Sequence, residues 1–367
     1  MHNKKAIIIG SGVAGMAAAI RLKVQGFDVD VYEKNNFPGG KLHAFEKGGF
    51  YFDAGPSLFT QPKNIEELFA LAGEPVEKYF SYKRLGIACK YFYGNGKVVQ
   101  AFTDAKIFAK ELQEQLNENP EAVASYLRQS EKAYERIGNI FLNYSLHKAR
   151  TWLHKRIINA LAVVKPSYLF SSLHHYNKQH FSSPEAVQLF NRFATYNGSN
   201  PYKAPGMLSL IPHLEMNEGA FYPMGGMISI TKALYNLAKG KGVQFHFNSP
   251  VQRIAHANGK ANGIIVNDEM MEADIVVSNS DVYFTYKNLL GDISKANRVL
   301  RQERSSSAVI FYWGIKKQFP ELQLHNIFFS NDYESEFDGI FNKKRIADDK
   351  EICRRGRRPL RRIKALG

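Results

Sequence analysis

The sequence predicts an α/β fold, in which a Rossmann-like domain with a parallel sheet is interrupted by an inserted α+β domain. One basis for this prediction is a short apolar run, Ala6 to Ile9, that leads directly into closely spaced glycines. Another is an Ala-rich helical stretch followed by a second apolar strand, Asp28 to Tyr32. The length of 367 residues is more than one ordinary domain needs.

The glycines after the first strand stand in the order G-x-G-x-x-G, as Gly10, Gly12 and Gly15. Gly10 permits a tight turn, Gly12 lets the backbone approach a pyrophosphate, and Gly15 allows close packing of helix on strand. The predicted helix ends before Gly26. Glu33 then follows the second strand, where a carboxylate can accept ribose hydroxyls and would repel the extra phosphate of NADP. This order of elements predicts a dinucleotide site, and a structural glycine turn is the alternative.

A second glycine pair follows Glu33. Gly39 and Gly40 stand beside Lys41, and the run G-F-x-F-D-x-G-P-S occupies residues 49–57. Such a loop either crosses close to a bound pyrophosphate or is a surface turn between two strands. The residues alone leave both readings open.

The stretches E-K-x-x-x-P-G-G-K and G-F-x-F-D-x-G-P-S resemble the amine-oxidase-type flavoproteins, in particular the phytoene desaturase family. Y-P-x-G-G-M from Tyr222 is similar to the same family, and the likeness covers residues 4 to about 341. K-L-H-A-F and G-P-S-L-F-T resemble the carotenoid 3,4-desaturases that act on hydroxylated carotenoids. The resemblance implies an FAD-dependent enzyme that introduces C=C bonds into a carotene or hydroxylated carotenoid by hydride transfer to flavin.

In that family the glycine pair contacts the flavin nucleotide and the D-x-G-P-S turn lies near the isoalloxazine ring. The residue that matches Val251 contacts the adenine side through its backbone. The predicted FAD-binding residues are Gly10, Ser11, Gly12, Ala14, Gly15, Glu33, Lys34, Gly39, Gly40, Lys41, Gly55, Pro56, Ser57 and Val251. No catalytic side chain is identified, because the flavin supplies the hydride acceptor and the protein binds and orients. The histidines lack metal-ligand spacing, so we expect no metal.

The resemblance also implies a discontinuous FAD-binding domain over 1–80 and 222–290, with a membrane-facing substrate domain over 81–221 and 291–341. Several elements are expected from the residues: a hairpin over 90–102 turned at Gly94-Asn95-Gly96, helices over 105–117 and 121–143, and a meander of strands from Pro250 through the Asn258-Gly259 turn to Asn279. The run from Phe190 to Asn200 either lines a hydrophobic tunnel or belongs to a buried core.

Residues 148–165 form a basic stretch in which Leu153, Ile157, Leu161 and Val164 share one helical stripe. Such a helix can lie in a membrane interface and admit a lipid-soluble substrate, or it can be an ordinary helix packed on a core. No segment reaches the roughly eighteen apolar residues that span a bilayer. We therefore expect a cytoplasmic protein that rests peripherally on the inner face of the membrane.

About half of the formal charge of +15 lies at the C-terminus, where residues 343–367 hold eleven lysines and arginines against three acids, and the remaining residues carry a moderate surplus of +7. Nucleic-acid binding is therefore not expected. Family members close the FAD domain with a C-terminal G-D-x-x-x-P-G-x-G-x-P motif that is missing here. We expect residues 342–367 to be a non-native tail from a frameshift or truncation, and a lipid-binding basic tail is the alternative. The rival functions are an inactive remnant of such an enzyme and a related flavoprotein such as a carotenoid isomerase.

Overall fold

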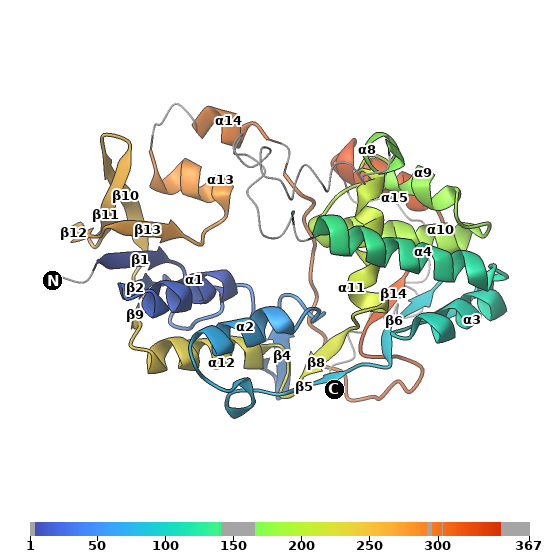
Figure 1. Ribbon diagram of the computed structural model, residues 1–367, viewed down its shortest axis with the longest axis horizontal. Coiled ribbons are helices and arrows are strands. Elements are labelled where there is room, and N and C mark those ends of the chain that lie inside the picture. The colour runs from blue at the N-terminus through green and yellow to red at the C-terminus, as the bar shows by residue number, and fades with distance from the viewer. Residues whose placement is uncertain (1–3, 139, 141–165, 292–295, 303, 346–367) are drawn as a thin grey trace. The chain divides into compact units, whose positions relative to one another are not determined.

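The chain forms two compact units, each made of two stretches of sequence (Figure 1). Unit 1 comprises residues 1–83 and 221–304, and unit 2 comprises residues 84–220 and 305–367. The predicted assignment of one domain to FAD and the other to substrate stays a prediction. The structure is a computed structural model that describes residues 4–138, 140, 166–291, 296–302 and 304–345.

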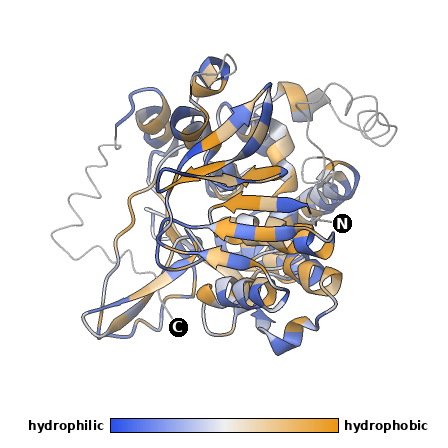
Figure 2. Cartoon of the chain, turned by 90° about the vertical axis from the view of Figure 1, so that its left-hand side faces the viewer, coloured by the Kyte–Doolittle hydropathy of each residue, from blue (hydrophilic) through white to orange (hydrophobic). Residues whose placement is uncertain are grey.

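A four-stranded parallel sheet with the order β13-β1-β2-β9 lies at the centre of unit 1. Figure 2 turns this unit toward the viewer and shows its strands with orange, apolar stretches. The strands are β1 (Lys5–Ile9), β2 (Asp28–Tyr32), β9 (Gln244–His246) and β13 (Ile275–Ser278).

Strand β1 is buried on both faces. Ala6 and Ile8 belong to a core cluster with helix residues such as Met16 and Leu234, whereas Ile7 and Ile9 belong to a cluster with residues of a second, antiparallel sheet. A strand covered on both sides has no polar face, which explains the uninterrupted apolar run in the sequence. The covering helices are α1 (Val13–Val24), α2 (Lys63–Leu71) and α12 (Ile228–Gly240).

The antiparallel sheet is a meander of β10 (Val251–Ala257), β11 (Lys260–Val266) and β12 (Glu269–Glu272). Asn258 and Gly259 connect the first two strands with φ of 50° and 75°, as expected of a two-residue hairpin turn. The prediction that residues 273–279 continue this meander is wrong. They form β13, which leaves the meander and pairs in parallel with β1.

Shorter elements complete the region around unit 1. They are β3 (His43–Lys47), β4 (Phe50–Ala54), β5 (Tyr82–Arg84), β8 (Phe221–Pro223), α13 (Val282–Phe284) and α14 (Ala296–Leu300). Of these, β3 pairs with β4 and β5 pairs with β8. Gly26 follows α1 with φ of 88°, so the predicted glycine stop of this helix is confirmed.

Unit 2 holds a three-stranded sheet with the order β14-β6-β7. The predicted hairpin is confirmed: β6 (Ile87–Phe92) and β7 (Val98–Phe102) are antiparallel, and Gly96 lies in the turn with φ of 90°. The third strand is β14 (Asn326–Phe328), which lies parallel to β6. The helices are α3 (Ala105–Leu116), α4 (Pro120–Ala133), α8 (Pro166–Phe170), α9 (Leu173–Lys178), α10 (Pro184–Asn191), α11 (Pro212–Met216) and α15 (Tyr333–Phe341).

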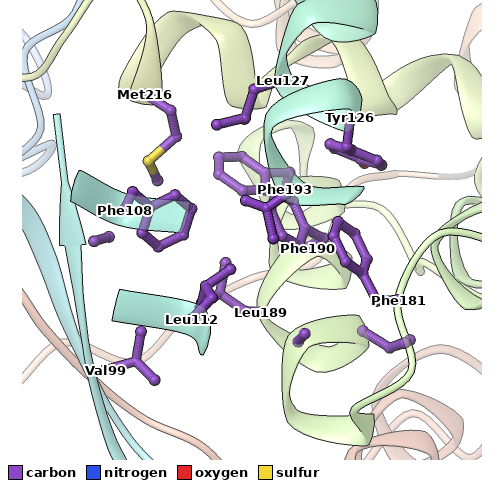
Figure 3. Close-up of a cluster of buried hydrophobic side chains, with 14 of the residues drawn as sticks. Val99, Phe108, Leu112, Tyr126, Leu127, Phe181, Leu189, Phe190, Phe193 and Met216 are labelled. Atoms are coloured by element: carbon purple, nitrogen blue, oxygen red, sulfur yellow. The ribbon is translucent and has the colours of Figure 1, made fainter. Parts of the chain in front are cut away.

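Side chains from the sheet and helices of unit 2 meet in one apolar core (Figure 3). Phe190 lies at its centre, stacked on Phe181 with ring centroids 4.4 Å apart and tilted against Tyr126 at 4.7 Å. Phe193 is also fully buried in this cluster. Of the two readings of this stretch, the buried core is therefore the one that applies to Phe190 and Phe193.

Two predicted segments lie outside the described residues: the basic amphipathic stretch 148–165, and residues 346–367 of the tail. The second helix predicted for unit 2, over 121–143, is observed as α4, followed by a single wider turn over Tyr134–Gly138, and its last part, residues 139 and 141–143, lies outside the described residues. In the part of the chain that the structure describes, no helix combines the length and apolar character needed to cross a membrane.

Candidate functional site

The first glycine turn follows β1 and leads into α1. Gly10 has φ of 93° and its N–H donates to the carbonyl of Tyr32 at the end of β2. A Cβ on Gly15 would lie 2.1 Å from the carbonyl oxygen of Gly10, so only glycine permits this approach of helix to strand. No side chain caps α1 at Gly12, so the first backbone N–H groups of the helix point toward the space beyond its N-terminus.

The second glycine turn lies directly beside the first. The N–H of Gly39 donates to the carbonyl oxygen of Ser11 at 2.9 Å, and Gly39 and Gly12 form a parallel bridge. A Cβ on Gly40 would lie 3.3 Å from the Cα of Gly12, and a Cβ on Gly39 would lie 2.3 Å from the carbonyl oxygen of Leu42. The fold thus brings together two glycine turns that the sequence separates.

The carboxylate of Glu33 is fixed next to these turns. Its Oε2 accepts hydrogen bonds from the backbone N–H and the hydroxyl of Ser11, both at 2.8 Å. Its Oε1 accepts the N–H of Asn35 at 3.0 Å. Glu33 is only 5% exposed, so the carboxylate is held in one place at the carboxyl end of β2 rather than solvated at the surface.

The residues on either side of Glu33 differ in exposure and charge. Tyr32 is buried and its ring stacks on His246 at 4.5 Å. Burial, with a smaller contribution from the Asp30 carboxylate, raises the pKa of Tyr32, so its phenol stays neutral. Lys34 is exposed and offers a cation at the rim of the same turn.

The strand that begins at Val251 approaches the same place through the residues that precede it. The N–H of Ser249 donates to the carbonyl of Glu33 at 2.8 Å, and the N–H of Asn248 donates to the carbonyl of Asn35 at 3.1 Å. Val251 is half-buried at the start of β10. The structure therefore brings the backbone just before Val251 to Glu33, although some 215 residues separate them in sequence.

The D-x-G-P-S turn packs on the loop that carries the second glycine pair. Gly55 has φ of 92°, and a Cβ there would lie 1.8 Å from the carbonyl oxygen of Lys41. Lys41 and Pro56 are exposed, and Ser57 is half-buried. The G-G-K and D-x-G-P-S stretches therefore form one continuous surface of unit 1.

Sequence reasoning missed Asp53 and Thr231, which join this surface to α12 by hydrogen bonds. The Asp53 carboxylate accepts the N–H groups of Met227 at 2.8 Å and Ile228 at 3.4 Å. The hydroxyl of Thr231 donates to the carbonyl of Leu42 at 2.8 Å. The joint occurrence of D-x-G-P-S and Y-P-x-G-G-M in one sequence was the signal that could have linked them.

Asn279 is a third residue that the sequence did not single out. Its N–H donates to the carbonyl of Ile9 at 2.9 Å, and its amide Nδ2 lies 3.4 Å from the carbonyl oxygen of Gly10. A Cβ on Gly12 would lie 2.8 Å from Nδ2, and one on Gly15 would lie 2.9 Å from it. The Asn279 side chain therefore lies over the glycine turn and directly follows β13.

These features fit a dinucleotide. In the sheet, β2 is the neighbour of β1 on one side and β13 is its neighbour on the other, so the strand order reverses at β1. Ligands of open parallel sheets bind at the carboxyl ends of the strands beside such a reversal. The uncapped N-terminus of α1 suits a pyrophosphate, the glycines leave room for it, and the buried carboxylate of Glu33 suits ribose hydroxyls.

Comparison with known proteins agrees with this fit. The family of flavin containing amine oxidoreductases matches residues 13–326. A 1-hydroxycarotenoid 3,4-desaturase from a Flavobacterium species is 48% identical over 95% of this chain and 71% of its own length. A 4,4'-diapolycopene oxygenase from a Methylomonas species is 31% identical over 95% of this chain and 70% of its own. A zeta-carotene-forming phytoene desaturase from Myxococcus xanthus is 30% identical over 95% of this chain and 67% of its own length.

Solved structures share the fold at low sequence identity. An oxidoreductase from Methanosarcina mazei is 21% identical with a TM-score of 0.53, over 81% of this chain and 63% of its own. A putrescine oxidase, solved with putrescine bound, is 14% identical with a TM-score of 0.54, over 81% of this chain and 63% of its own. With its glycine turns, its parallel sheet and these relatives, the chain belongs to the flavin containing amine oxidoreductase family, in the phytoene desaturase branch, whose cofactor is FAD.

Proposed function

We propose that this chain is an FAD-dependent desaturase that introduces C=C bonds into a carotenoid, with hydroxylated carotenoids as the preferred substrates. The observation that carries the proposal is the meeting of the Gly12 and Gly39 turns at the uncapped N-terminus of α1. The substrate class rests on the relative that is 48% identical and acts on 1-hydroxycarotenoids. Bound FAD supplies a hydride acceptor, so an unactivated carbon chain can be oxidised without a protein nucleophile.

We assign the predicted binding residues to parts of the cofactor by their place in unit 1. The two glycine turns and the first turn of α1 would hold the pyrophosphate, and Glu33 would accept the ribose hydroxyls. The backbone around Val251 would hold the adenine side, and the D-x-G-P-S turn would hold the ring system. The pyrophosphate residues are Gly10, Ser11, Gly12, Ala14, Gly15, Gly39 and Gly40, with Lys34 and Lys41 as cations at the rim, and the ring-side residues are Gly55, Pro56 and Ser57.

The protein's own contribution is to bind and to hold geometry. Ser11 fixes the Glu33 carboxylate with two hydrogen bonds of 2.8 Å, so the carboxylate need not reorganise when it accepts ribose hydroxyls. Asp53 fixes the start of α12, and Gly55 packs on the Lys41 backbone, which holds the ring-side turn in place. No side chain is assigned to proton transfer.

Turnover under anaerobic conditions tests the proposed reaction. The purified chain with bound FAD is mixed with a 1-hydroxylated carotenoid in lipid vesicles. We expect the absorbance of oxidised flavin to decrease while the carotenoid absorbance moves to longer wavelength, since each new double bond lengthens the conjugated system. The same carotenoid without its hydroxyl group should react more slowly. A flavin that is bound but stays oxidised with both carotenoids contradicts the proposal.

We further propose that the protein contacts the cytoplasmic face of a membrane, since its proposed substrate is lipid-soluble. The basic stretch 148–165 supports this by its sequence pattern. Sedimentation with anionic lipid vesicles tests it, with the paired substitution Lys155→Glu and Arg156→Glu as the variant. We expect the wild-type chain to sediment with the vesicles and the variant to stay in solution. Equal sedimentation of both, or of neither, contradicts this part of the proposal.

A further inference from the structure

A chain of hydrogen bonds runs through unit 2 from its apolar core to a half-buried histidine. The hydroxyl of Tyr126 in α4 donates to Oδ1 of Asn177 at 2.7 Å. Nδ2 of Asn177 donates to Oδ1 of Asn191 at 2.9 Å, and Nδ2 of Asn191 lies 2.9 Å from Nδ1 of His174. Tyr126, Asn177 and Asn191 are fully buried, whereas His174 is half-buried. The chain therefore joins α4, α9 and α10 and ends at a side chain that can bind a proton.

The phenol of Tyr126 fixes the direction of this chain. Burial raises the pKa of Tyr126 well above its usual value, so its hydroxyl keeps its proton. In the part of the chain that the structure describes, this hydroxyl bonds only to Asn177. An amide that accepts with its oxygen offers its NH2 group to the next member, so the donor role passes step by step toward His174. Nδ1 of His174 must then accept, which requires a neutral ring with its proton on Nε2.

Protonation of His174 conflicts with this arrangement. A charged imidazole carries a proton on both nitrogens, so Nδ1–H would face the NH2 group of Asn191. The members can pair again only if both amides turn over, and then the O–H of Tyr126 loses its acceptor. The Tyr126 ring lies in the apolar core against Phe181 and Phe190 (Figure 3). A hydroxyl donor without a partner is unfavourable in such a place.

The groups that face His174 disfavour its charge on balance. Burial makes the largest contribution and lowers the pKa of His174 below its ordinary value of 6.5. Lys178 and His175 on the same helix lower the pKa further, whereas Glu334 of α15 raises it. Tyr202 packs on the imidazole ring with centroids 4.6 Å apart and carries no charge, since burial raises its pKa to about 12.

We propose that His174 and the hydrogen-bond chain behind it form a pH-sensitive switch in unit 2. The neutral ring accepts from Asn191 and holds α9 and α10 on α4 through the two buried amides. The charged ring reverses or breaks the chain, so the packing of these three helices loosens.

The switch operates below pH 6.5, the ordinary pKa of histidine. Folding lowers the pKa of His174, so the unfolded chain binds the proton more readily than the folded chain does. The stabilisation by the neutral ring is therefore fully present above the unfolded pKa, and it is lost as pH falls through the folded pKa.

A second histidine lies close to the chain of hydrogen bonds but outside it. The ring of His180 packs edge-on against Tyr126 with centroids 5.4 Å apart, and its Nδ1 lies 2.8 Å from the carbonyl oxygen of Tyr176. A measurement that reads His174 alone separates the two histidines.

NMR of the histidine ring nitrogens in the isotope-labelled 367-residue chain tests the proposal. The signals of His174 are assigned by their loss in His174→Gln. At about pH 8 we expect the proton of the neutral ring on Nε2, and titration should give a pKa below 6.5. Asn191→Asp places a carboxylate opposite Nδ1 and should raise the pKa of His174 by about one unit or more, which is a tenfold gain in proton affinity.

Amide hydrogen exchange, corrected for the intrinsic effect of pH, measures the packing of α9 and α10. Between about pH 8 and about pH 5, exchange in the wild type should become faster by up to roughly tenfold for each unit by which folding lowers the pKa of His174. Asn191→Asp should abolish this acceleration. The matched control is Asn197→Asp, which adds the same charge at an exposed asparagine outside the hydrogen-bond chain and should behave as the wild type.

Two results on the wild type alone overturn the proposal: a proton on Nδ1 of the neutral His174 ring, or a pKa of His174 at or above 6.5. These readings do not depend on the folding of any variant. Exchange over α9 and α10 that does not accelerate in the wild type also overturns it, as does a pKa of His174 that is equal in Asn191→Asp and Asn197→Asp.

Discussion

The carboxylate of Asp53 accepts a hydrogen bond of 2.8 Å from the backbone N–H of Met227, 174 residues further along the chain. A second bond comes from the N–H of Ile228 at 3.4 Å. Asp53 thereby caps the first turn of α12 with the last residues of β4. The D-x-G-P-S and Y-P-x-G-G-M stretches are therefore two halves of one structural element, and each depends on the other for its conformation.

Asp53→Ala should lower the free energy of unfolding by about 1–3 kcal/mol, because it leaves buried N–H groups without an acceptor. Asp53→Asn keeps one acceptor oxygen of the same shape and should cost less. Urea unfolding followed by circular dichroism measures both. Equal stability of Asp53→Ala and the wild type would show that the cap does not hold α12.

If the two glycine turns bind the cofactor, a side chain added to one of them should lower the affinity for FAD. Gly39→Ala should weaken FAD binding roughly tenfold or more, because the new Cβ would lie 2.3 Å from the carbonyl of Leu42 at a residue with φ of 108°. Gly240→Ala is the control, since nothing lies within 4 Å of a Cβ there. Quenching of FAD fluorescence on titration measures both variants. A Gly39→Ala chain that binds FAD as tightly as the control contradicts the assignment of this turn.

Asn279 should contribute to FAD affinity, because its side chain covers the first glycine turn. Asn279→Ala removes the amide group near the Gly10 carbonyl and Gly12, and we expect FAD affinity to fall roughly tenfold. Asn262→Ala, at an exposed asparagine of β11, should leave affinity unchanged. The same FAD titration measures both variants. Equal FAD affinities of Asn279→Ala and Asn262→Ala would show that Asn279 does not contribute to FAD binding.

The carboxyl group of Glu185 makes the stability of unit 2 depend on pH. Partial burial alone would raise the pKa of its carboxyl, but the hydrogen bonds to it, led by that of Lys97, outweigh burial and lower the pKa from 4.5 to about 2. Lys97 Nζ lies 2.8 Å from Oε1, and the Asn95 amide donates to the same oxygen. The carboxylate therefore stabilises the fold fully above the unfolded pKa of 4.5, and this stabilisation is lost as pH falls toward 2.

Thermal unfolding of Glu185→Gln and the wild type from pH 7 to pH 2 checks this dependence. At neutral pH the variant should be less stable by about 1–2 kcal/mol, since it loses charge-assisted hydrogen bonds. The difference should shrink as pH falls from about 4.5 to about 2. A difference that stays constant over this range would show that the carboxylate charge does not contribute.

The buried ion pair of Arg192 and Glu215 gives a stability prediction for the core of unit 2. Arg192 Nη2 lies 2.7 Å from Glu215 Oε2, with the side chains 10% and 1% exposed. Arg192→Leu leaves a buried carboxylate without its cation and should cost about 3–5 kcal/mol. The double variant with Glu215→Leu should recover part of this loss in urea unfolding. A double variant that is less stable than Arg192→Leu alone contradicts this account.

The sequence predicted the N-terminal part of the fold because its signals are local. The turn from β1 into α1 and the stop at Gly26 depend on residues within a few positions of each other. The hairpin at Gly96 depends on its own turn residues in the same way. Such elements can be read from periodicity and turn chemistry alone.

The place of β13 could not be read in this way. Its four residues, I-V-V-S, follow three antiparallel strands and have the composition of a fourth. Its parallel pairing with β1 joins Ile7 to Val276, and no local pattern specifies a partner at that distance. Because the place of β13 beside β1 could not be predicted, the position of Asn279 over the glycine turn could not be predicted either.

The central claim is that Gly12, Gly39 and Glu33 form an FAD site in this chain. The most direct measurement is the visible absorption spectrum of the purified 367-residue chain after incubation with FAD and removal of free cofactor. The account predicts an oxidised flavin spectrum at close to one FAD per chain, lost in Gly39→Ala. A folded chain that stays colourless after the same treatment contradicts it.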